Sequence, residues 1–165
     1  MSYNETLVKE LLEYIPQTGK LEWIGIRPGK KQELIELKSA RLEQGSGLEG
    51  DRFSRSISGK RQVTLIQQEH MQVVAEILGK SKIDPGLIRR NLVVSGINLL
   101  SLKHQTFQIG KTVLETTGIC DPCGRMEENL GSGGYNALRG HGGITAKVIE
   151  AGEILIGDLV ELLKV

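Results

Sequence analysis

The sequence is poor in aromatic residues, in cysteine and in net charge, and each shortage narrows the range of functions. Phe, Trp and Tyr make up 4% of the 165 residues, so a surface that stacks nucleic-acid bases is not expected. Lys and Arg number 21 against 20 Asp and Glu, which gives no general reason to expect nucleic acid or membrane as a partner. Only two cysteines are present, too few for a disulfide framework.

Long hydrophobic runs are also missing. No apolar stretch approaches the length of about 20 residues that a membrane span needs. The N-terminal stretch MSYNETLVKELLEYIPQTGK lacks the basic start and the apolar run of a secretory signal peptide. We therefore expect a cytoplasmic protein.

Glycine, in contrast, is abundant. The 21 glycines cluster at 45–50, 131–134 and 140–143, between apolar runs, as expected for tight turns or for backbone that approaches a ligand. The length and the hydrophobic fraction of 39% predict one domain with one core, because no linker or internal repeat divides the chain.

Short strands dominate the predicted secondary structure. Strands are expected at 21–27, 34–42, 61–66, 91–95, 106–109, 112–116, 144–150, 153–156 and 159–163. Helices are expected at 4–15, 67–78 and 124–130, the first with Asn4 as its N-cap and Pro16 at its end. Val63 and Leu65 alternate with polar residues, which predicts a half-buried strand at 61–66. This pattern favours a mostly β fold, a barrel or sandwich with a few short helices, over a doubly wound sheet.

The two cysteines form a Cys-x-x-Cys motif where a predicted strand ends and a predicted helix begins. Cys123 would lie near the helix N-terminus, where unpaired N–H groups favour a thiolate, and Arg125 adds positive charge. A thiolate is both a nucleophile and a metal ligand. The placement therefore suits either sulfur transfer or metal binding.

Spacing alone leaves four interpretations of Cys120 and Cys123 open. The thiols could have no role, because free cysteine often packs as a small hydrophobic residue. They could be half of a zinc site, although His70, His104 and His141 form no paired motif. A thioredoxin-like dithiol would need a βαβ setting, which the strand pattern does not supply. The fourth interpretation is a thiolate that carries a persulfide or binds molybdenum.

Six motifs, taken in order, favour the fourth interpretation. They are GLEGDR at 47–52, RQVTLI at 61–66, RRN at 89–91, CDPCGRM at 120–126, RGHGGITAKV at 139–148, and a last stretch from Gly152 to GDLV at 157–160. Each motif is weak alone, but the ordered series resembles the MOSC family, named for the C-terminal region of molybdenum cofactor sulfurases. The resemblance implies one MOSC domain over 1–165, with an N-terminal helix in 1–16 and a β-barrel module over 21–163.

The resemblance also implies a site for the molybdenum cofactor, an anionic pterin with a dithiolene and a phosphate. Such a site needs fixed positive charge and free N–H groups. Cys123 is the expected molybdenum ligand and catalytic residue, and His141 is a second catalytic candidate as an acid, a base or a substrate contact. The expected cofactor contacts are Arg52, Arg89, Arg90, Asn91, Arg125 and Arg139.

Several of these residues also have plain structural interpretations. Arg89 and Arg90 could be solvated surface charges, whereas in the family pattern they could clamp phosphate through their fork geometry. Asp51 could orient Arg52 or simply satisfy the backbone of its own turn. The glycine-rich loop 139–143 could present its amides to an anion, or leave His141 merely exposed.

Three functions follow from the resemblance. The first is a molybdenum enzyme that reduces N-hydroxylated compounds and needs a separate electron-donor protein, since larger relatives have extra domains without a counterpart here. The second is a sulfur carrier, in which Cys123 takes a persulfide from a cysteine desulfurase whose pyridoxal phosphate belongs to that partner. The third is a binding module that does not need Cys123.

Overall fold

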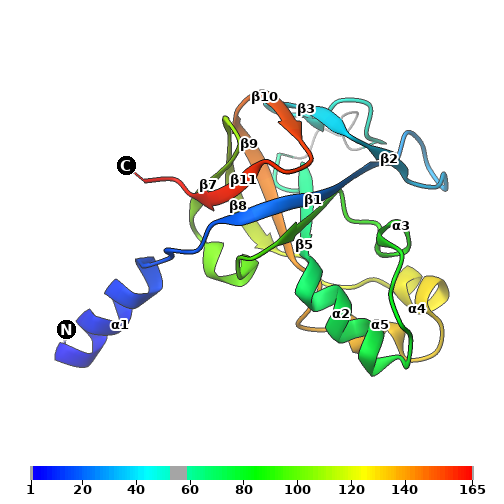
Figure 1. Cartoon of the computed structure of the whole chain (residues 1–165), viewed down its shortest axis with the longest axis horizontal. Coiled ribbons are helices and arrows are strands. Elements are labelled where there is room, and N and C mark those ends of the chain that lie inside the picture. Colours follow the sequence, from blue (N-terminus) through cyan, green and yellow to red (C-terminus); the bar gives the residue numbers. More distant parts are fainter. Residues whose placement is uncertain (1, 53–58, 165) are drawn as a thin grey trace.

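The computed structural model describes residues 2–52 and 59–164, and its centre is a closed β-barrel (Figure 1). Seven strands of the described residues follow the order β11-β7-β8-β9-β5-β6-β1, and β1 pairs back with β11. They are β1 (Gly19–Ile26), β5 (Val63–Gln67), β6 (Leu92–Ser95), β7 (Thr106–Ile109), β8 (Thr112–Ile119), β9 (Ile144–Glu150) and β11 (Leu159–Leu162). Closure pairs the outer strands of the sheet with each other, so the mostly β barrel predicted from the sequence is confirmed.

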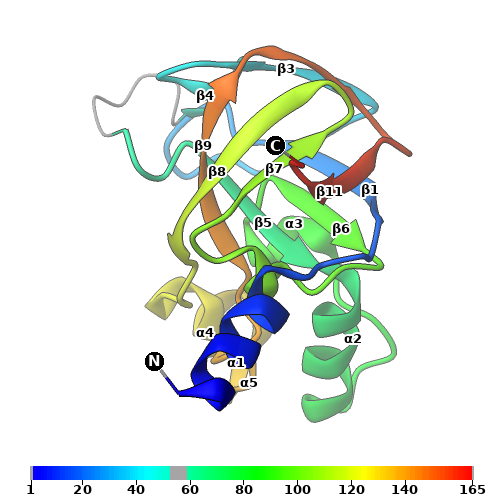
Figure 2. The same cartoon turned by 90° about the vertical axis from the view of Figure 1, so that its left-hand side faces the viewer.

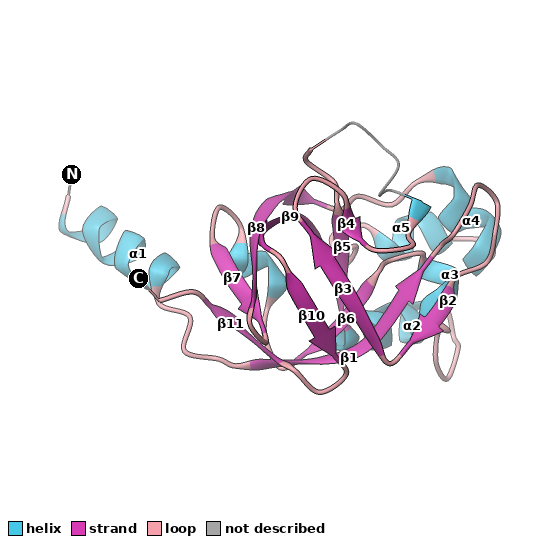
Figure 3. Ribbon diagram, turned by 90° about the horizontal axis from the view of Figure 1, so that it is seen from above, coloured by secondary structure: helices cyan, strands magenta, loops and turns pink. Residues whose placement is uncertain are grey.

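A small second sheet lies over one end of the barrel (Figure 3). It consists of β10 (Gly152–Leu155), β3 (Ser39–Glu43) and β4 (Gly47–Leu48), while β2 (Ile35–Leu37) extends β1. Leu42, Leu48 and Ile154 of this sheet are fully buried and pack with barrel residues such as Phe107 and Leu65. The two sheets therefore share one apolar core.

Short helices gather at the opposite end of the barrel, as Figures 1 and 2 show. They are α2 (Gln68–Ile77), α3 (Pro85–Ile88), α4 (Gly124–Leu130) and α5 (Gly134–Leu138). Their apolar faces form a second core with Ile66 and Val93 of the barrel. The carboxylate of Glu127 accepts hydrogen bonds from the backbone N–H groups of Tyr135 and Gly133, at 3.0 and 2.6 Å, and these bonds lower the pKa of Glu127. This contact fixes α5 against α4.

Two further elements lie outside these groups. The 3₁₀ helix η2 (Leu99–Leu102) follows β6, and α1 (Tyr3–Glu13) precedes β1. In the part of the chain that the structure describes, no helix combines the length and the apolar content needed to cross a membrane.

The structure corrects several of the predicted elements. The expected strand 34–42 divides at Lys38, because its first half pairs with β1 and its second half pairs with β10. Strand β5 is buried on both faces rather than one. The buried side chains of Thr64 and Gln67 accept hydrogen bonds from the backbone N–H groups of Asn91 and Leu99. Helix α1 takes Ser2 rather than Asn4 as its N-cap, in a capping box with Glu5.

Candidate functional site

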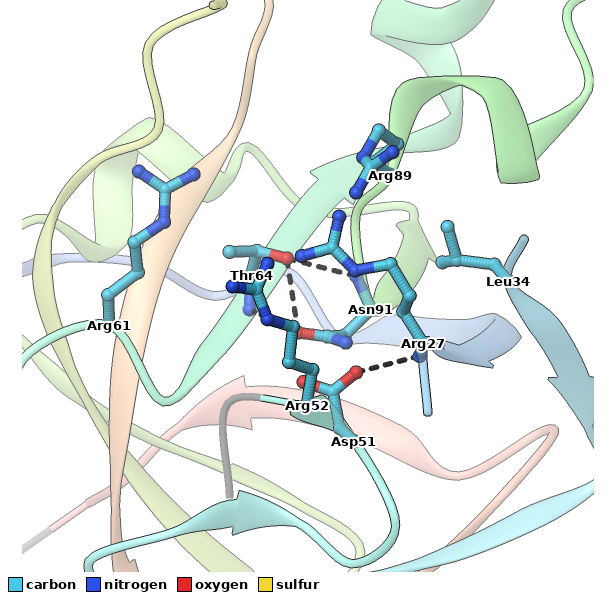
Figure 4. Close-up of a pocket in the computed structure, with 8 residues that line it drawn as sticks. All are labelled: Arg27, Leu34, Asp51, Arg52, Arg61, Thr64, Arg89 and Asn91. Atoms are coloured by element: carbon cyan, nitrogen blue, oxygen red, sulfur yellow. Dashed lines mark hydrogen bonds between the residues drawn. The ribbon is translucent and has the colours of Figure 1, made fainter. Parts of the chain in front are cut away.

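A cavity of about 280 Å³ lies where the end of β1, the turn after β4, the start of β5 and the α3–β6 connection meet. Four of its eight lining residues are arginines, with a single carboxylate among them. The lining consists of Arg27, Leu34, Asp51, Arg52, Arg61, Thr64, Arg89 and Asn91. Figure 4 shows the side chains of Arg27, Arg52 and Arg89 gathered around one space, with Arg61 standing apart at the left. Four guanidinium groups against one carboxylate give the cavity lining a net positive charge, which would favour an anionic ligand.

Arg27, at the end of β1, was not identified from the sequence. Its backbone N–H donates a hydrogen bond to Oδ1 of Asp51 at 2.8 Å, and its carbonyl accepts one from the backbone N–H of Arg52 at 2.6 Å. Its Nε is buried and has no hydrogen-bond partner among the described residues. Burial lowers the pKa of Arg27, and the positive charge of Arg52 lowers it further. An anion would satisfy the donor and offset the repulsion between the two guanidinium groups.

Arg89 and Arg90 are adjacent in sequence but point to different places. Arg89 caps α3 in the left-handed conformation, with φ of 62°, which is uncommon for a residue other than glycine. This turn brings Arg89 to the cavity wall and sends Arg90 into the interior, where it is 4% exposed. The expected clamp by both arginines therefore does not form around this cavity.

Arg90 instead binds three backbone carbonyls. Its Nε donates to Gly142 at 2.9 Å, its Nη1 to Ile88 at 3.0 Å and its Nη2 to Cys120 at 3.4 Å. Burial lowers the pKa of Arg90. The side chain that the sequence assigned to the cofactor thus joins the cysteine segment to the glycine-rich loop, and it is absent from the cavity lining.

Asn91 lines the cavity, and its side chain also forms hydrogen bonds that hold neighbouring strands together at the base of the cavity. Its Oδ1 accepts hydrogen bonds from the backbone N–H of Thr64 at 3.1 Å and from the Thr64 hydroxyl at 3.2 Å. Its Nδ2 donates to the carbonyl of Gly25 at 3.1 Å. Asn91 therefore connects the start of β6 with β5 and β1, and it holds Thr64 in place at the base of the cavity.

The two cysteines have different environments. Cys123 is exposed and is the N-cap residue of α4, as predicted, whereas Cys120 is fully buried. The Sγ of Cys120 accepts a hydrogen bond from Nη2 of Arg61 at 3.4 Å, so Arg61 links the buried thiol to the cavity wall. Cys123 and Arg125 lie within electrostatic reach of Arg27. Cys123 is therefore the accessible thiol, although neither Cys123 nor Arg125 lines the cavity.

Arg139 and His141 lie apart from the cavity. Arg139 is exposed, contacts Oδ1 of Asn136 at 3.4 Å and borders a separate depression beside Asp121. His141 is half-buried, with Nδ1 3.0 Å from the carbonyl oxygen of Ala137, and its ring stands edge-on to His70 at 5.2 Å between centroids. Neither residue lines the cavity that the arginines form.

Two glycines of loop 139–143, Gly142 and Gly143, are required by close packing. A Cβ on Gly142 would lie 2.1 Å from the carbonyl oxygen of Cys120, and one on Gly143 would lie 1.8 Å from that of Leu65. The carbonyl of Gly143 accepts a hydrogen bond from the backbone N–H of Cys120 at 2.9 Å. Close contact between backbones thus accounts for Gly142 and Gly143, and the expectation that the loop presents its amides to an anion stays a prediction.

Comparisons with known proteins agree with this architecture. The family model of the MOSC domain matches residues 45–161. The solved structure of the YuaD protein from Bacillus subtilis superposes with a TM-score of 0.76 at 22% identity, covering 90% of this chain and 98% of that chain. YiiM from Geobacillus stearothermophilus gives a TM-score of 0.72 at 14% identity, covering 88% and 75% of the two chains.

A further similar structure is YiiM from Escherichia coli, with a TM-score of 0.66 at 18% identity and coverage of 88% of this chain and 70% of that chain. A comparison with curated protein sequences gave no match. At these identities the solved structures show the fold, and the family model shows the ancestry. Because that model spans most of the barrel and includes both cysteines, the chain belongs to the MOSC domain family.

Proposed function

We propose that this protein binds the molybdenum cofactor at the arginine-lined cavity, with Cys123 as the metal ligand. The observation that carries the proposal is the buried, unpartnered Nε of Arg27 in a cavity with three further arginines. The phosphate and the dithiolene of the cofactor carry negative charge, so its anionic groups are acceptors for these donors. The cavity volume of about 280 Å³ lies just below the range of about 300–1,000 Å³ for ligand pockets, so the cavity suits an anionic group of the cofactor better than the whole pterin.

Each residue of the site has a distinct part in this proposal. Arg27, Arg52 and Arg89 donate hydrogen bonds to the anionic group, and Asn91 keeps the cavity floor rigid. Cys123 contributes its thiolate from the exposed start of α4. When bound, the cofactor supplies a metal that exchanges two electrons with a substrate. The protein's own contribution is binding, orientation and positive charge.

The resemblance to the MOSC family supports a reaction on N-hydroxylated compounds as the finer part of this proposal. In that reaction a hydroxylamine nitrogen loses its oxygen: two electrons and two protons convert R–NH–OH into R–NH₂ and water. The electrons would come from a separate electron-donor protein. We assign no proton transfer to His141, because it does not line the arginine cavity.

The exposure of Cys123 favours a second candidate, a sulfur carrier. Its thiolate would attack the terminal sulfur of a persulfide on a cysteine desulfurase, and the partner's cysteine would leave as a thiolate. Cys120 is buried and its Sγ already contacts Arg61, so Cys123 is the thiol that such a partner could reach. In this case the cavity arginines would stabilise the negative charge of the persulfide that forms.

Molybdenum content per chain tests the first proposal. The wild type, Cys123→Ala and Arg27→Gln would be purified from a host that synthesises the cofactor, with Arg41→Gln as a control because Arg41 is exposed on β3. Near-stoichiometric metal in the wild type and the control, with loss in Cys123→Ala and reduction in Arg27→Gln, supports it. Metal-free wild type contradicts it.

The sulfur-carrier proposal has a separate readout. After incubation with a cysteine desulfurase and cysteine, mass spectrometry would locate added sulfur on the chain. Persulfide on Cys123 in a protein that carries no molybdenum supports the carrier. A protein with neither metal nor persulfide would be assigned to the third function, a binding module.

A further inference from the structure

A second cavity, of about 460 Å³, adjoins the arginine-lined cavity. Trp23 of β1 lines it together with residues of segment 31–36 and of α3, and we call it the Trp23 cavity. Leu34 and Arg89 line both cavities, so the two share a wall. Figure 4 shows these two side chains at one edge of the arginine-lined cavity. Together the two cavities reach the size of a small-molecule site, which the arginine-lined cavity alone does not.

The ring of Trp23 lies over Gly25 of its own strand. A Cβ at Gly25 would be 2.0 Å from Cη2 of Trp23 and 3.0 Å from Cδ2 of Leu34. The indole ring and Leu34 thus occupy the space that a side chain at position 25 would fill. Trp23 is only half-buried, so it presents aromatic surface to the cavity. Aromatic surface of this kind binds planar heterocyclic rings by stacking.

Glu36 brings a carboxylate to the same place. In the antiparallel register of β1 and β2, Glu36 lies directly opposite Gly25. Opposite residues of such a pair face the same side of the sheet, so Glu36 and the Trp23 ring share one face. Asp84 also lines the cavity, but its Oδ1 accepts a hydrogen bond from the backbone N–H of Gly86 at 2.9 Å. Glu36 is therefore the carboxylate that the sheet places beside the ring.

The two cavities have opposite charge. The arginine-lined cavity has four guanidinium groups and one carboxylate. The Trp23 cavity has more carboxylates than cations, with Glu33, Glu36 and Asp84 against Lys31 and the shared Arg89. A ligand that spans both cavities needs an anionic group at one end. At the other end it needs a planar ring that donates hydrogen bonds.

We propose that the two cavities together bind a planar 2-amino-4-oxopyrimidine ring system that carries a phosphate. The ring lies against Trp23, its N–H edge meets Glu36, and the phosphate lies among the arginines. In such a ring the amino group and the adjacent ring N–H point in the same direction, so one carboxylate accepts both hydrogen bonds. Guanine nucleotides and phosphorylated pterins have this chemistry in common. The inference rests on the proposed anion site and extends it, because the pterin of the molybdenum cofactor is one such ring.

Trp23 is the only tryptophan of the chain, so its fluorescence reports on rings that bind beside it. The protein would be purified from a host that does not synthesise the molybdenum cofactor. It would then be titrated with GMP, neopterin monophosphate, AMP and inorganic phosphate. The ligands with the 2-amino-4-oxopyrimidine edge should quench the fluorescence, and inorganic phosphate should leave it unaltered. AMP should bind about tenfold more weakly than GMP, because a ring acceptor replaces the ring N–H and faces the carboxylate.

Calorimetric titration of two variants separates the parts of the site. Glu36→Gln should bind GMP about tenfold more weakly and lose most of the preference over AMP, because the second acceptor oxygen becomes a donor. Trp23→Leu should also bind GMP about tenfold more weakly, through loss of stacking. Its affinity for inorganic phosphate should equal that of the wild type, which shows that the variant is folded. Glu10→Gln on α1 is the matched control, since Glu10 lines neither cavity.

The tighter of GMP and neopterin monophosphate identifies the source of the ring, a nucleotide or the pterin of the cofactor. A wild type that binds neither of them more tightly than inorganic phosphate would overturn the inference. So would AMP binding as tight as that of the better ligand, or a Glu36→Gln variant that behaves like the control. Phosphate binding that persists in these cases leaves the anion site intact and removes this inference alone. The cofactor proposal fails separately, through metal-free wild type in the molybdenum measurement.

Discussion

The carboxylate of Asp51 accepts a hydrogen bond from the backbone N–H of Arg27 at 2.8 Å, across 24 positions of sequence. The next residue, Arg52, donates its own backbone N–H to the carbonyl of Arg27 at 2.6 Å. Two arginines of the cavity are thus fixed to each other through their backbones. Their guanidinium groups line the same cavity at close enough range for Arg52 to lower the pKa of Arg27.

Arg27→Gln should weaken anion binding without weakening the fold. A hydrogen bond between charged groups contributes about 1.5–3 kcal/mol, so the affinity for inorganic phosphate should fall about 10- to 100-fold. The free energy of unfolding should be unchanged or slightly higher, because the repulsion from Arg52 is removed. Calorimetric titration with phosphate at low salt measures the first effect and urea unfolding the second. An affinity equal to that of Arg41→Gln would rule out the assigned role of Arg27.

Arg90→Met should destabilise the protein. The substitution leaves the carbonyls of Gly142, Ile88 and Cys120 in the interior without their donor. Buried groups that lose a partner cost about 1–3 kcal/mol each, partly relieved by relaxation, so we expect a loss of about 3 kcal/mol. Urea unfolding measures it. Arg139→Met is the control, since that exposed side chain has one weak contact and should cost under about 0.5 kcal/mol.

Most of the fold could be predicted because its determinants are local. Alternating apolar residues and turn glycines marked the strands, and the hairpin at 106–116 and the helix at 124–130 lie at their expected positions. The sequence did not reveal which strands pair with one another. Strand β5 lies between β9 and β6 in the barrel wall. Its polar Thr64 is therefore buried by residues distant in sequence, such as Asn91, and the alternation of apolar and polar residues does not reveal such contacts. The short helix α5 is stabilised at its start by Glu127, whose carboxylate accepts a hydrogen bond from the backbone N–H of Gly133, six residues later.

The site could be predicted only in part, for a similar reason. Family motifs marked Cys123, Arg52 and Arg89, but no motif contained Arg27. Arg89 and Arg90 are chemically identical in sequence, and a single left-handed φ at Arg89 separates their roles. A backbone dihedral of this kind depends on the turn between α3 and β6, which residue type alone does not specify.

Gly143→Ala should destabilise the protein strongly, whereas Gly140→Ala should be tolerated. Both glycines have φ in the left-handed region, at 88° and 80°. An added Cβ at Gly143 would overlap the carbonyl of Leu65 on β5, whereas one at Gly140 meets nothing within 4 Å. We expect about 1 kcal/mol for Gly140→Ala and more than about 3 kcal/mol for Gly143→Ala. Urea unfolding of the two variants checks this, and equal losses would show that the loop moves freely away from β5.

His70 should make stability depend on pH in the weakly acidic range. Burial lowers the pKa of His70, and the neighbouring His141 lowers it further, while Glu69 acts in the opposite direction. The unfolded chain, with a histidine pKa of about 6.5, then binds a proton more readily than the folded protein does. The contribution of His70 is therefore complete above about pH 6.5 and declines as the pH falls below that value.

Urea unfolding between about pH 8 and about pH 5 tests this sign on the wild type and His70→Gln. The wild type should lose stability across the interval more steeply than the variant, because the variant removes the partly buried ring that titrates. His104→Gln is the matched control, since His104 is exposed and should leave the slope unaltered. A slope in His70→Gln as steep as that of the wild type would assign the pH dependence to other groups. A shallower slope would show that the contact between α2 and the loop at His141 requires a neutral ring at position 70.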